Sequence, residues 1–207
     1  MDWDAGILLY IQEYIRTDLL DPFMIFITHT VDNGIFWIAL SIILFIIPKT
    51  RRTGFLAATS LIIEAVITNL LLKNVVARTR PYEVIDGLVN LIEKQKDYSF
   101  PSGHSGASFA VAGAIFVVAL LGLPVIEKTG ELTRAKTHIA FKIFAVLMLL
   151  YAVLVAFSRL YVGVHYPTDV LGGILLGIAS SFLVYFIYHF VMKKIARRKA
   201  EPKEQAV

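Results

Sequence analysis

The chain has 207 residues, of which 57% are hydrophobic and 17% are charged, and it contains no cysteine. Soluble domains carry about 25% charged residues, so this composition excludes an ordinary soluble domain and indicates an integral membrane protein; the absence of cysteine excludes disulfides and thiolate metal sites. The net charge of +4 does not indicate nucleic acid binding, because the cations lie beside apolar segments, where anionic lipid headgroups are the better partners.

The N-terminal segment, residues 1–20, is predicted to lie in the membrane interface instead of crossing it. Polar residues such as Asp4, Glu13 and Arg16 interrupt its apolar residues. The segment begins acidic where a signal peptide needs positive charge, and no small-x-small cleavage site follows, so we expect no cleaved targeting segment. A sixth span formed by these residues is the alternative.

Five later stretches are apolar and long enough to cross a bilayer, which takes about 20 helical residues. They cover residues 22–47, 54–72, 105–126, 139–157 and 168–192. No internal repeat, low-complexity segment or linker divides them. The sequence therefore predicts an all-α fold, a polytopic transmembrane helical bundle that forms a single domain over residues 1–207.

The last of these stretches contains the spacing Gly173-x-x-x-Gly177. Small residues at this spacing let helices approach closely, either within one bundle or between two copies of a chain. Packing within the bundle is the plainer interpretation of so short a motif, and the oligomeric state stays open.

Lysine and arginine predict the orientation of the chain. They cluster in the connection after the first span, in the connection after the third, and in the tail at 193–207; these cations are Lys49, Arg51, Arg52, Lys128, Arg134, Lys136, Lys193, Lys194, Arg197, Arg198, Lys199 and Lys203. Five spans place all three segments on one side, which we expect to be the cytoplasm. Segments 73–104 and 158–167 then lie outside, together with the N-terminus.

Three further cations gather on the predicted outer side. Lys73 and Arg80 are seven residues apart and share a face of a continuing helix, and Arg159 adds a third charge. Converging cations repel one another unless an anion lies between them, and both side chains match phosphate oxygens. Snorkelling at helix ends is the alternative for each residue taken singly.

Ser102 and Gly103 begin the third predicted helix, whose N-terminus points to the same side. Free backbone amides and the helix dipole favour an anion there; serine is a good cap, and glycine lets the backbone approach a ligand. The sequence thus predicts a phosphate site formed by these two residues with Lys73, Arg80 and Arg159.

Two histidines supply the chemistry for such a site. Pro167 suits the first turn of the last helix, so Asp169 lies in that turn, four residues after His165. A carboxylate bonded to one ring nitrogen makes the other a better nucleophile, so we assign His165 as nucleophile and Asp169 as its orienting residue. His104 is then the general acid for the leaving oxygen and the base for the attacking water. Three nearby cations disfavour a metal ion at this place.

These segments resemble the signature of the type 2 phosphatidic acid phosphatase family, which reads Lys-x6-Arg-Pro, Pro-Ser-Gly-His and Ser-Arg-x5-His-x3-Asp. The matching residues are Lys73, Arg80, Pro81, Pro101, Ser102, Gly103, His104, Ser158, Arg159, His165 and Asp169. The resemblance implies a helical membrane bundle and metal-free hydrolysis of lipid phosphates or pyrophosphates. We expect no cofactor, and the sequence indicates no obligatory protein partner. The chain is similar to bacterial phosphatidylglycerophosphatase B-like enzymes, so we expect a bacterial cytoplasmic membrane; the charge pattern places the site on the outer side.

The substrate stays open at this point. Phosphatidylglycerol phosphate is favoured, with undecaprenyl pyrophosphate and phosphatidate as alternatives, because all three share the phosphate that the motifs bind. A non-catalytic lipid-phosphate binder or transporter would be expected to have lost His104, His165 or Asp169. A vanadium-dependent haloperoxidase has a similar anion site, but those enzymes are soluble.

Other polar residues in the spans have more than one interpretation. Glu64, near the middle of the second span, either lines a headgroup or proton path or is a hydrogen-bonded structural acid. Asp32 and Asn33 lie nearer the outer surface and either touch substrate or pack in a wet region. His29 has no partner of suitable spacing and is predicted to be structural or solvated.

Overall fold

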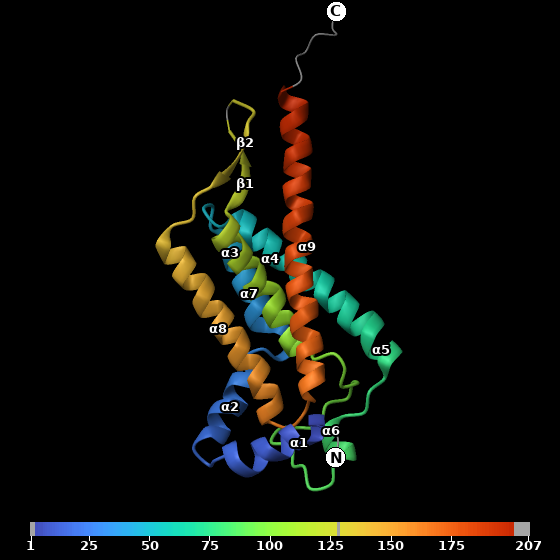
Figure 1. Ribbon diagram of the computed structural model, residues 1–207. Helices are drawn as coiled ribbons and strands as arrows, with labels where there is room; N and C mark the ends of the chain where they lie inside the picture. The colour runs from blue at the N-terminus through green and yellow to red at the C-terminus, as the bar shows by residue number, and fades with distance from the viewer. Residues whose placement is uncertain (1–2, 128, 201–207) are drawn as a thin grey trace, which may run out of the picture.

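Four helices are long and apolar enough to cross a bilayer within residues 3–127 and 129–200, which the computed structural model describes, and one bent pair of helices makes a fifth candidate span. They run side by side as an elongated bundle (Figure 1). The helices and helical turns are α1 (Trp3–Tyr10), η1 (Ile11–Ile15), α2 (Leu20–His29), η2 (Asp32–Gly34), α3 (Ile35–Ile46), α4 (Arg51–Val66), η3 (Ile67–Leu72), α5 (Lys73–Val76), α6 (Pro81–Val84), α7 (Gly103–Leu121), α8 (Ile139–Tyr161) and α9 (Pro167–Ala200). The prediction of a helical bundle with about five spans is confirmed.

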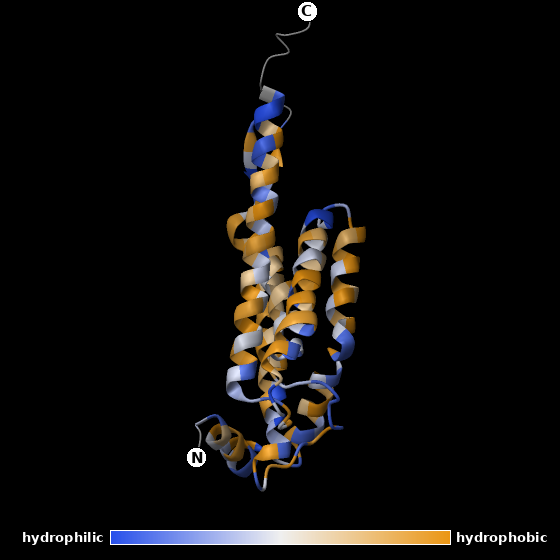
Figure 2. Cartoon of the chain, turned by 90° about the vertical axis from the view of Figure 1, so that its right-hand side faces the viewer, coloured by the Kyte–Doolittle hydropathy of each residue, from blue (hydrophilic) through white to orange (hydrophobic). Residues whose placement is uncertain are grey.

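The sides of the bundle are apolar and its ends are polar (Figure 2). Large hydrophobic side chains remain exposed along the outer faces of the long helices, among them Phe45, Ile62, Leu150 and Phe186. Such a surface would be a liability in water but is what a lipid-facing helix needs.

The N-terminal segment does not span. α1 has eight residues and the π-helical turn η1 has five, so neither reaches the length that a bilayer requires. α1 lies across the end of the bundle, beside the start of α9 (Figure 1). This placement agrees with the predicted interfacial helix; residues 1 and 2 lie outside the described part of the chain.

The first predicted span, residues 22–47, is not one continuous helix. The helical segments Leu20–His29 and Asp32–Ile46, the second of which contains η2 and α3, are bent by 47° to one another. Asn33 has φ 53° and Gly34 has φ 70°, the left-handed conformation that asparagine tolerates and glycine adopts freely. The sequence Asp32-Asn33-Gly34 therefore interrupts the helix, and Asp32 lies outside the regular turns of α2 and α3.

The third predicted span, residues 105–126, is longer than the helix that the structure contains. α7 ends at Leu121, and Gly122 with φ 73° leads into strand β1 (Leu123–Ile126), which pairs antiparallel with β2 (Leu132–Ala135). Pro124 is the physical reason, because proline lacks an amide hydrogen and breaks a helix interior. The apolar composition of Leu-Pro-Val-Ile hid this hairpin in the sequence.

The other spans differ from their predicted ranges mainly at the ends. α8 continues past residue 157 to Tyr161, and α9 continues past 192 to Ala200. The second span is α4 followed by the π-helical turn η3 and the short α5, which ends where Ala77 takes φ 47°.

The basic segments lie at one end of the bundle and the motif segments at the other (Figure 1). The α3–α4 connection, the β1–β2 hairpin and the end of α9 share the end away from α1, as the charge pattern predicts. Lys128 and Lys203, which contributed to that pattern, lie outside the described residues.

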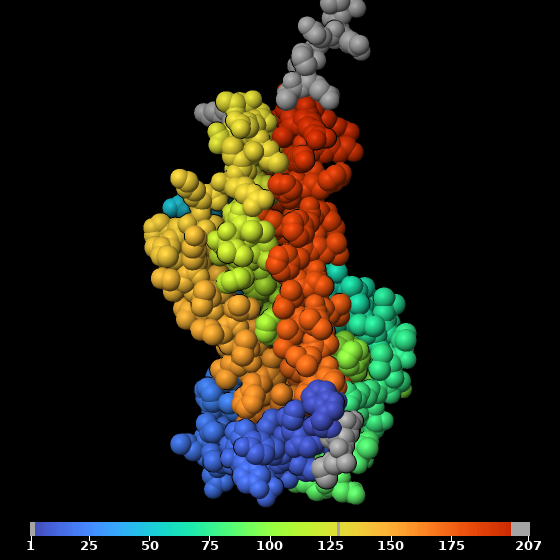
Figure 3. All heavy atoms as spheres, viewed as in Figure 1, coloured from blue at the N-terminus to red at the C-terminus, as the bar shows by residue number. Residues whose placement is uncertain are grey.

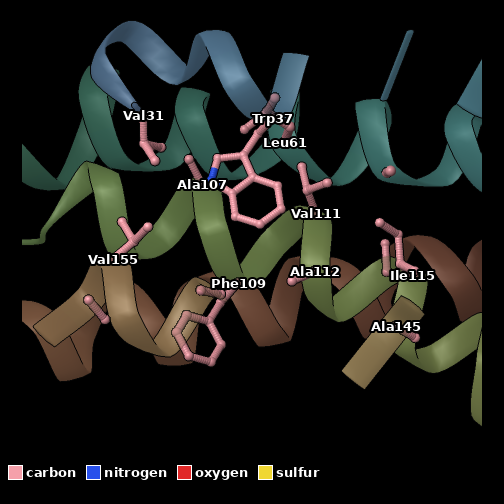
Figure 4. Packing of buried hydrophobic residues seen from close by; sticks show 14 of the residues in the cluster. Val31, Trp37, Leu61, Ala107, Phe109, Val111, Ala112, Ile115, Ala145 and Val155 are labelled. Atoms are coloured by element: carbon pink, nitrogen blue, oxygen red, sulfur yellow. The ribbon is translucent and has the colours of Figure 1, made fainter. Parts of the chain in front are cut away.

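α7 forms the centre of the bundle and is buried on nearly all sides, as its uniformly apolar and small residues require. Trp37 reaches from α3 toward α7 (Figure 4), and its Nε1 donates a hydrogen bond of 2.8 Å to Ser108 Oγ. On the other side α9 packs so closely that a Cβ on Gly173 would lie 2.4 Å from Ser102 O, and one on Gly177 would lie 2.5 Å from Gly106 O. The glycine motif thus serves packing within the bundle.

Candidate active site

The predicted site residues converge on a cavity of about 420 Å³ at the end of the bundle that α1 crosses. One part of its wall is apolar, formed by Val31, Ile38, Leu61 and Ala107. The remainder is polar and includes Asn33, Glu64, Lys73, Arg80, Gln95, Asp97, Gly103, His104, Arg159 and His165. A cavity with this division suits a molecule that carries both an anionic group and a hydrocarbon part.

His165 lies in the short connection between α8 and α9 and is 2% exposed. Its Nε2 is 3.1 Å from Arg80 Nη1, and its Nδ1 is 3.5 Å from Asp169 Oδ2. Because an arginine only donates, Nε2 is the acceptor and the network assigns the ring proton to Nδ1, facing the carboxylate. The lone pair of Nε2 therefore points at the cations, where a phosphate would lie.

The protonation state of His165 suits a nucleophile. Burial lowers its pKa, and the charges of Arg80 and Arg159 lower it further, while the hydrogen bond and charge of Asp169 act in the opposite direction. The net result is a pKa of about 3. The ring is neutral near pH 7 and has a free electron pair for attack on phosphorus.

Asp169 lies in the first turn of α9, whose first residue is Pro167 as predicted. Its side chain is fully buried. Oδ2 accepts hydrogen bonds from Ser99 Oγ and, at 3.0 Å, from the Tyr166 amide, while Oδ1 accepts one of 2.6 Å from Arg78 Nη1. These donors fix the carboxylate in one orientation behind His165.

The three predicted cations surround the cavity. Lys73 and Arg80 both pair with Asp97, a residue of the segment between α6 and α7. Arg159 is 1% exposed; its Nη1 donates to Thr28 Oγ1, and its Nε has no hydrogen-bond partner among the described residues. A buried guanidinium with an unused donor is suited to an incoming oxyanion.

Ser102 and Gly103 begin α7 as predicted, but only Gly103 lines the cavity. A Cβ on Gly103 would lie 3.9 Å from Lys73 Nζ, which places the positive end of the α7 dipole beside a cation. Ser102 is fully buried, and its Oγ accepts hydrogen bonds from the Ser105 amide and hydroxyl. Ser102 therefore caps α7, and it contributes to an anion site by stabilising the N-terminus of that helix.

His104 also has a carboxylate partner, which the sequence interpretation did not assign. Its Nε2 is 3.0 Å from Asp32 Oδ1, and Asp32 Oδ2 is 2.7 Å from His29 Nδ1. The break in the first span brings these residues together, so the structure contradicts the interpretation of His29 as a residue without a partner. The sequence signal that could have predicted this pairing was local: an acid lies three residues after a histidine, where Asp-Asn-Gly interrupts the helix.

Glu64 is a buried, hydrogen-bonded acid, as one of its two interpretations predicts, and it also lines the cavity. It is 1% exposed, accepts a hydrogen bond of 2.6 Å from Thr68 Oγ1, and contributes to the cavity wall. A Cβ on Gly106 would lie 1.9 Å from Glu64 Oε1, so a larger residue at that position of α7 would displace the Glu64 carboxylate.

Sequence reasoning missed Arg78, Asp4 and the pairing of Asp97. Arg78 lies two residues before Arg80 and contacts Asp169. Asp4 is an acid in an apolar helix. Asp97 is one of several acids on the predicted outer side, and its spacing does not distinguish it from the others. Within the described residues, no group of three or more histidine, aspartate or glutamate side chains is placed to hold a metal ion.

We expect Asp97 to compete with an incoming phosphate for Lys73 and Arg80, because it pairs with both. Partial burial alone would raise its pKa, but the hydrogen bonds and charges of the two cations prevail and lower the pKa to about 2. The carboxylate therefore stays ionised as pH falls below its ordinary pKa. The same three residues also line a second cavity of about 570 Å³, so this ion-pair cluster borders both cavities.

Replacing Asp97 with asparagine is expected to tighten the binding of inorganic phosphate about fivefold, because the competing charge is removed. The effect corresponds to about 1 kcal/mol, the range of a half-exposed ion pair. Product inhibition by phosphate measures it, at neutral and mildly acidic pH alike. Glu93→Gln, an exposed acid of the same segment, is the control; equal inhibition constants for Asp97→Asn and the wild type would contradict the competition.

Comparison with known proteins identifies similar molecules. The family model of the PAP2 superfamily matches residues 53–193. The chain is 35% identical to the undecaprenyl-diphosphatase of Sulfolobus acidocaldarius over 71% of this chain and 61% of that protein, and 35% identical to phosphatidylglycerophosphatase B of Bacillus subtilis over 57% and 50%. The match thus spans between half and three-fifths of these relatives.

The fold is similar to that of a solved membrane phosphatase. The crystal structure of a PAP2-type phosphatidylglycerolphosphate phosphatase from Bacillus subtilis superposes with a TM-score of 0.67 at 27% sequence identity, over 98% of this chain and 88% of the other. The likeness extends beyond the motif region and includes the N-terminal segment.

Proposed function

Because the chain belongs to the PAP2 superfamily, we propose that it is a membrane lipid phosphatase and that it releases the terminal phosphate of a lipid through a phosphohistidine on His165. The observation that carries this proposal is the pair of contacts on that ring. Nδ1 faces the buried Asp169 carboxylate, and Nε2 faces the cations around a partly apolar cavity.

Binding of the substrate begins with the phosphate taking the place of Asp97 on Lys73 and Arg80. The unused donor of Arg159 and the start of α7 at Gly103 bind further oxygens. The apolar part of the wall, formed by Val31, Ile38, Leu61 and Ala107, receives the adjoining hydrocarbon. These groups are already in place to stabilise the negative charge that develops on the phosphoryl oxygens in the transition state.

The first chemical step forms a bond from His165 Nε2 to phosphorus and breaks the bond from phosphorus to the lipid oxygen. His104 protonates that oxygen as it leaves. In the second step His104 takes a proton from water, the water oxygen bonds to phosphorus, and the phosphorus–nitrogen bond breaks. Inorganic phosphate and neutral His165 result, and no metal ion takes part in either step.

Phosphatidylglycerol phosphate is the first substrate that we propose, because the similar crystal structure from Bacillus subtilis is that of a phosphatidylglycerolphosphate phosphatase. Undecaprenyl pyrophosphate is the second, because the relative from Sulfolobus acidocaldarius that bears that activity in its name matches a larger share of this chain. Both lipids present a terminal phosphoryl group to the same residues. By the distribution of Lys and Arg, the site faces outside and the C-terminus lies in the cytoplasm.

The test is phosphate release from both lipids by the purified protein in detergent, with excess chelator present. Wild-type release that the chelator does not affect, and that the His165→Ala variant lacks, is the expected result. His189→Ala is the matched control, because that histidine lies about 30 Å along α9 from Asp169. Release abolished by the chelator would refute the metal-free mechanism, and no release from either lipid would favour a binder or transporter.

A further inference from the structure

We propose that Asp4 and Arg78 are positioning residues that hold the Asp169 carboxylate in place behind His165, which makes the N-terminal helix α1 part of the catalytic apparatus. The inference rests on the proposed function, since it concerns the support of the proposed nucleophile. None of the three sequence motifs contains Asp4, and Arg78 occupies an unspecified position of the first.

Arg78 joins two buried carboxylates. Its Nη1 donates to Asp169 Oδ1 at 2.6 Å and its Nη2 donates to Asp4 Oδ2 at 2.9 Å. The guanidinium also lies over the ring of Tyr166, 3.7 Å from the ring centroid. A planar group held by two carboxylates and a ring face has one orientation, so Arg78 transmits the position of Asp4 to Asp169.

Asp4 also binds the helix that carries Asp169. Its Oδ1 accepts a hydrogen bond of 3.1 Å from the Thr168 amide, and its Oδ2 accepts one from the Thr168 hydroxyl. The Thr168 amide belongs to the first turn of α9, where backbone donors lack partners within the helix. A carboxylate from the other end of the sequence thus satisfies the start of α9 and opposes the positive end of its dipole.

The burial of these charges makes the arrangement sensitive. The side chains of Asp4 and Asp169 are 4% and 0% exposed, with one guanidinium between them. Removing the Asp4 charge leaves Arg78 Nη2 without its carboxylate partner, so the guanidinium is held less firmly against Asp169. Because Asp169 Oδ2 already lies 3.5 Å from His165 Nδ1, a small further displacement would release the ring from the orientation that attack requires.

Asp4 is not the sole attachment of the N-terminal segment, so its charge can be removed without detaching α1. Arg16 donates to Tyr161 O at 2.8 Å and to Val89 O at 2.6 Å. Leu8 is 1% exposed and belongs to a cluster with Leu88. Figure 3 shows this segment packed against the lower ends of α8 and α9.

The experiment compares Asp4→Asn, Asp4→Glu and the control Glu13→Gln, an exposed acid of the same segment. For Asp4→Asn we expect kcat to fall about 10- to 100-fold, with KM and the inhibition constant of vanadate changed by no more than about threefold, because the cations of the phosphate site are untouched. Asp4→Glu keeps the charge and should recover most of kcat. Arg78→Lys, which keeps a charge but loses the planar fork, should behave like Asp4→Asn.

Each outcome separates the positioning role from a merely structural one. Unchanged kcat in Asp4→Asn overturns the inference, and so does a fall in kcat with a parallel loss of vanadate binding, since the whole site would then have been lost. If Asp4→Asn does not fold, Arg78→Lys decides by the same criteria. A wild-type protein without lipid phosphatase activity would refute the proposed function itself, whereas an active wild type matched by active variants refutes only the role of Asp4 and Arg78.

Discussion

Replacing His165 with alanine is expected to abolish lipid phosphate hydrolysis, by a factor of about 10⁴ or more, because no other group takes over the attack on phosphorus. The side chain is buried between Asp169 and Arg80, and its removal leaves both with other partners. We therefore expect the variant to fold and to bind vanadate about as well as the wild type. Phosphate release and vanadate binding on the same preparation measure the two properties.

Trapping the intermediate gives a second readout for His165. Acid-labile, alkali-stable label from a ³²P-labelled lipid is expected on the wild-type protein and is expected to be absent from His165→Ala. Label on the variant, or a variant rate within tenfold of the wild type, would remove His165 as the nucleophile and assign covalent catalysis to another residue.

The spans were predictable because bilayer thickness imposes one length and one composition on each of them. The errors fell where backbone details decide. Pro124 ends an apolar run that composition alone would continue as helix, and the left-handed Asn33 and Gly34 divide the first span. Both are turn-forming residues within apolar sequence, so their local chemistry outweighed the hydrophobic pattern.

The site residues were predictable as a set because their spacing along each helix end carries the chemistry. Their partners were not. Asp97 reaches Lys73 across 24 residues, and Asp4 reaches Thr168 across 164. Which acid pairs with which cation depends on how the helix ends are arranged in space, and no periodicity in the sequence encodes that arrangement.

The N-terminal segment illustrates the same limit of prediction from sequence. Its composition correctly predicted a helix too short to span a bilayer, but Asp4 within it is buried against Arg78. A charged residue on a short apolar helix is ordinarily solvated, and only the structure identifies the cation that makes its burial favourable.

Replacing His104 with alanine is expected to slow hydrolysis of lipid substrates about 10²- to 10⁴-fold, because the lipid oxygen leaves poorly without a proton. The same variant should lose less than about tenfold in the first-turnover release of nitrophenolate from p-nitrophenyl phosphate, since nitrophenolate needs no protonation to leave. Stopped-flow absorbance measures that release, and phosphate assays measure the lipid reaction.

The contrast between the two leaving groups separates proton transfer from binding. If His104 only bound phosphate, both substrates would slow equally, and the general-acid role would be wrong. Asp32→Asn offers the matched comparison, because Asp32 bonds Nε2 of His104 and Nδ1 of His29 but has no part in the proposed proton transfer to the lipid. Asp32→Asn should also slow the lipid reaction more than the nitrophenyl reaction, but by a smaller factor than His104→Ala. The His104 ring remains in this variant and loses only the carboxylate that orients it.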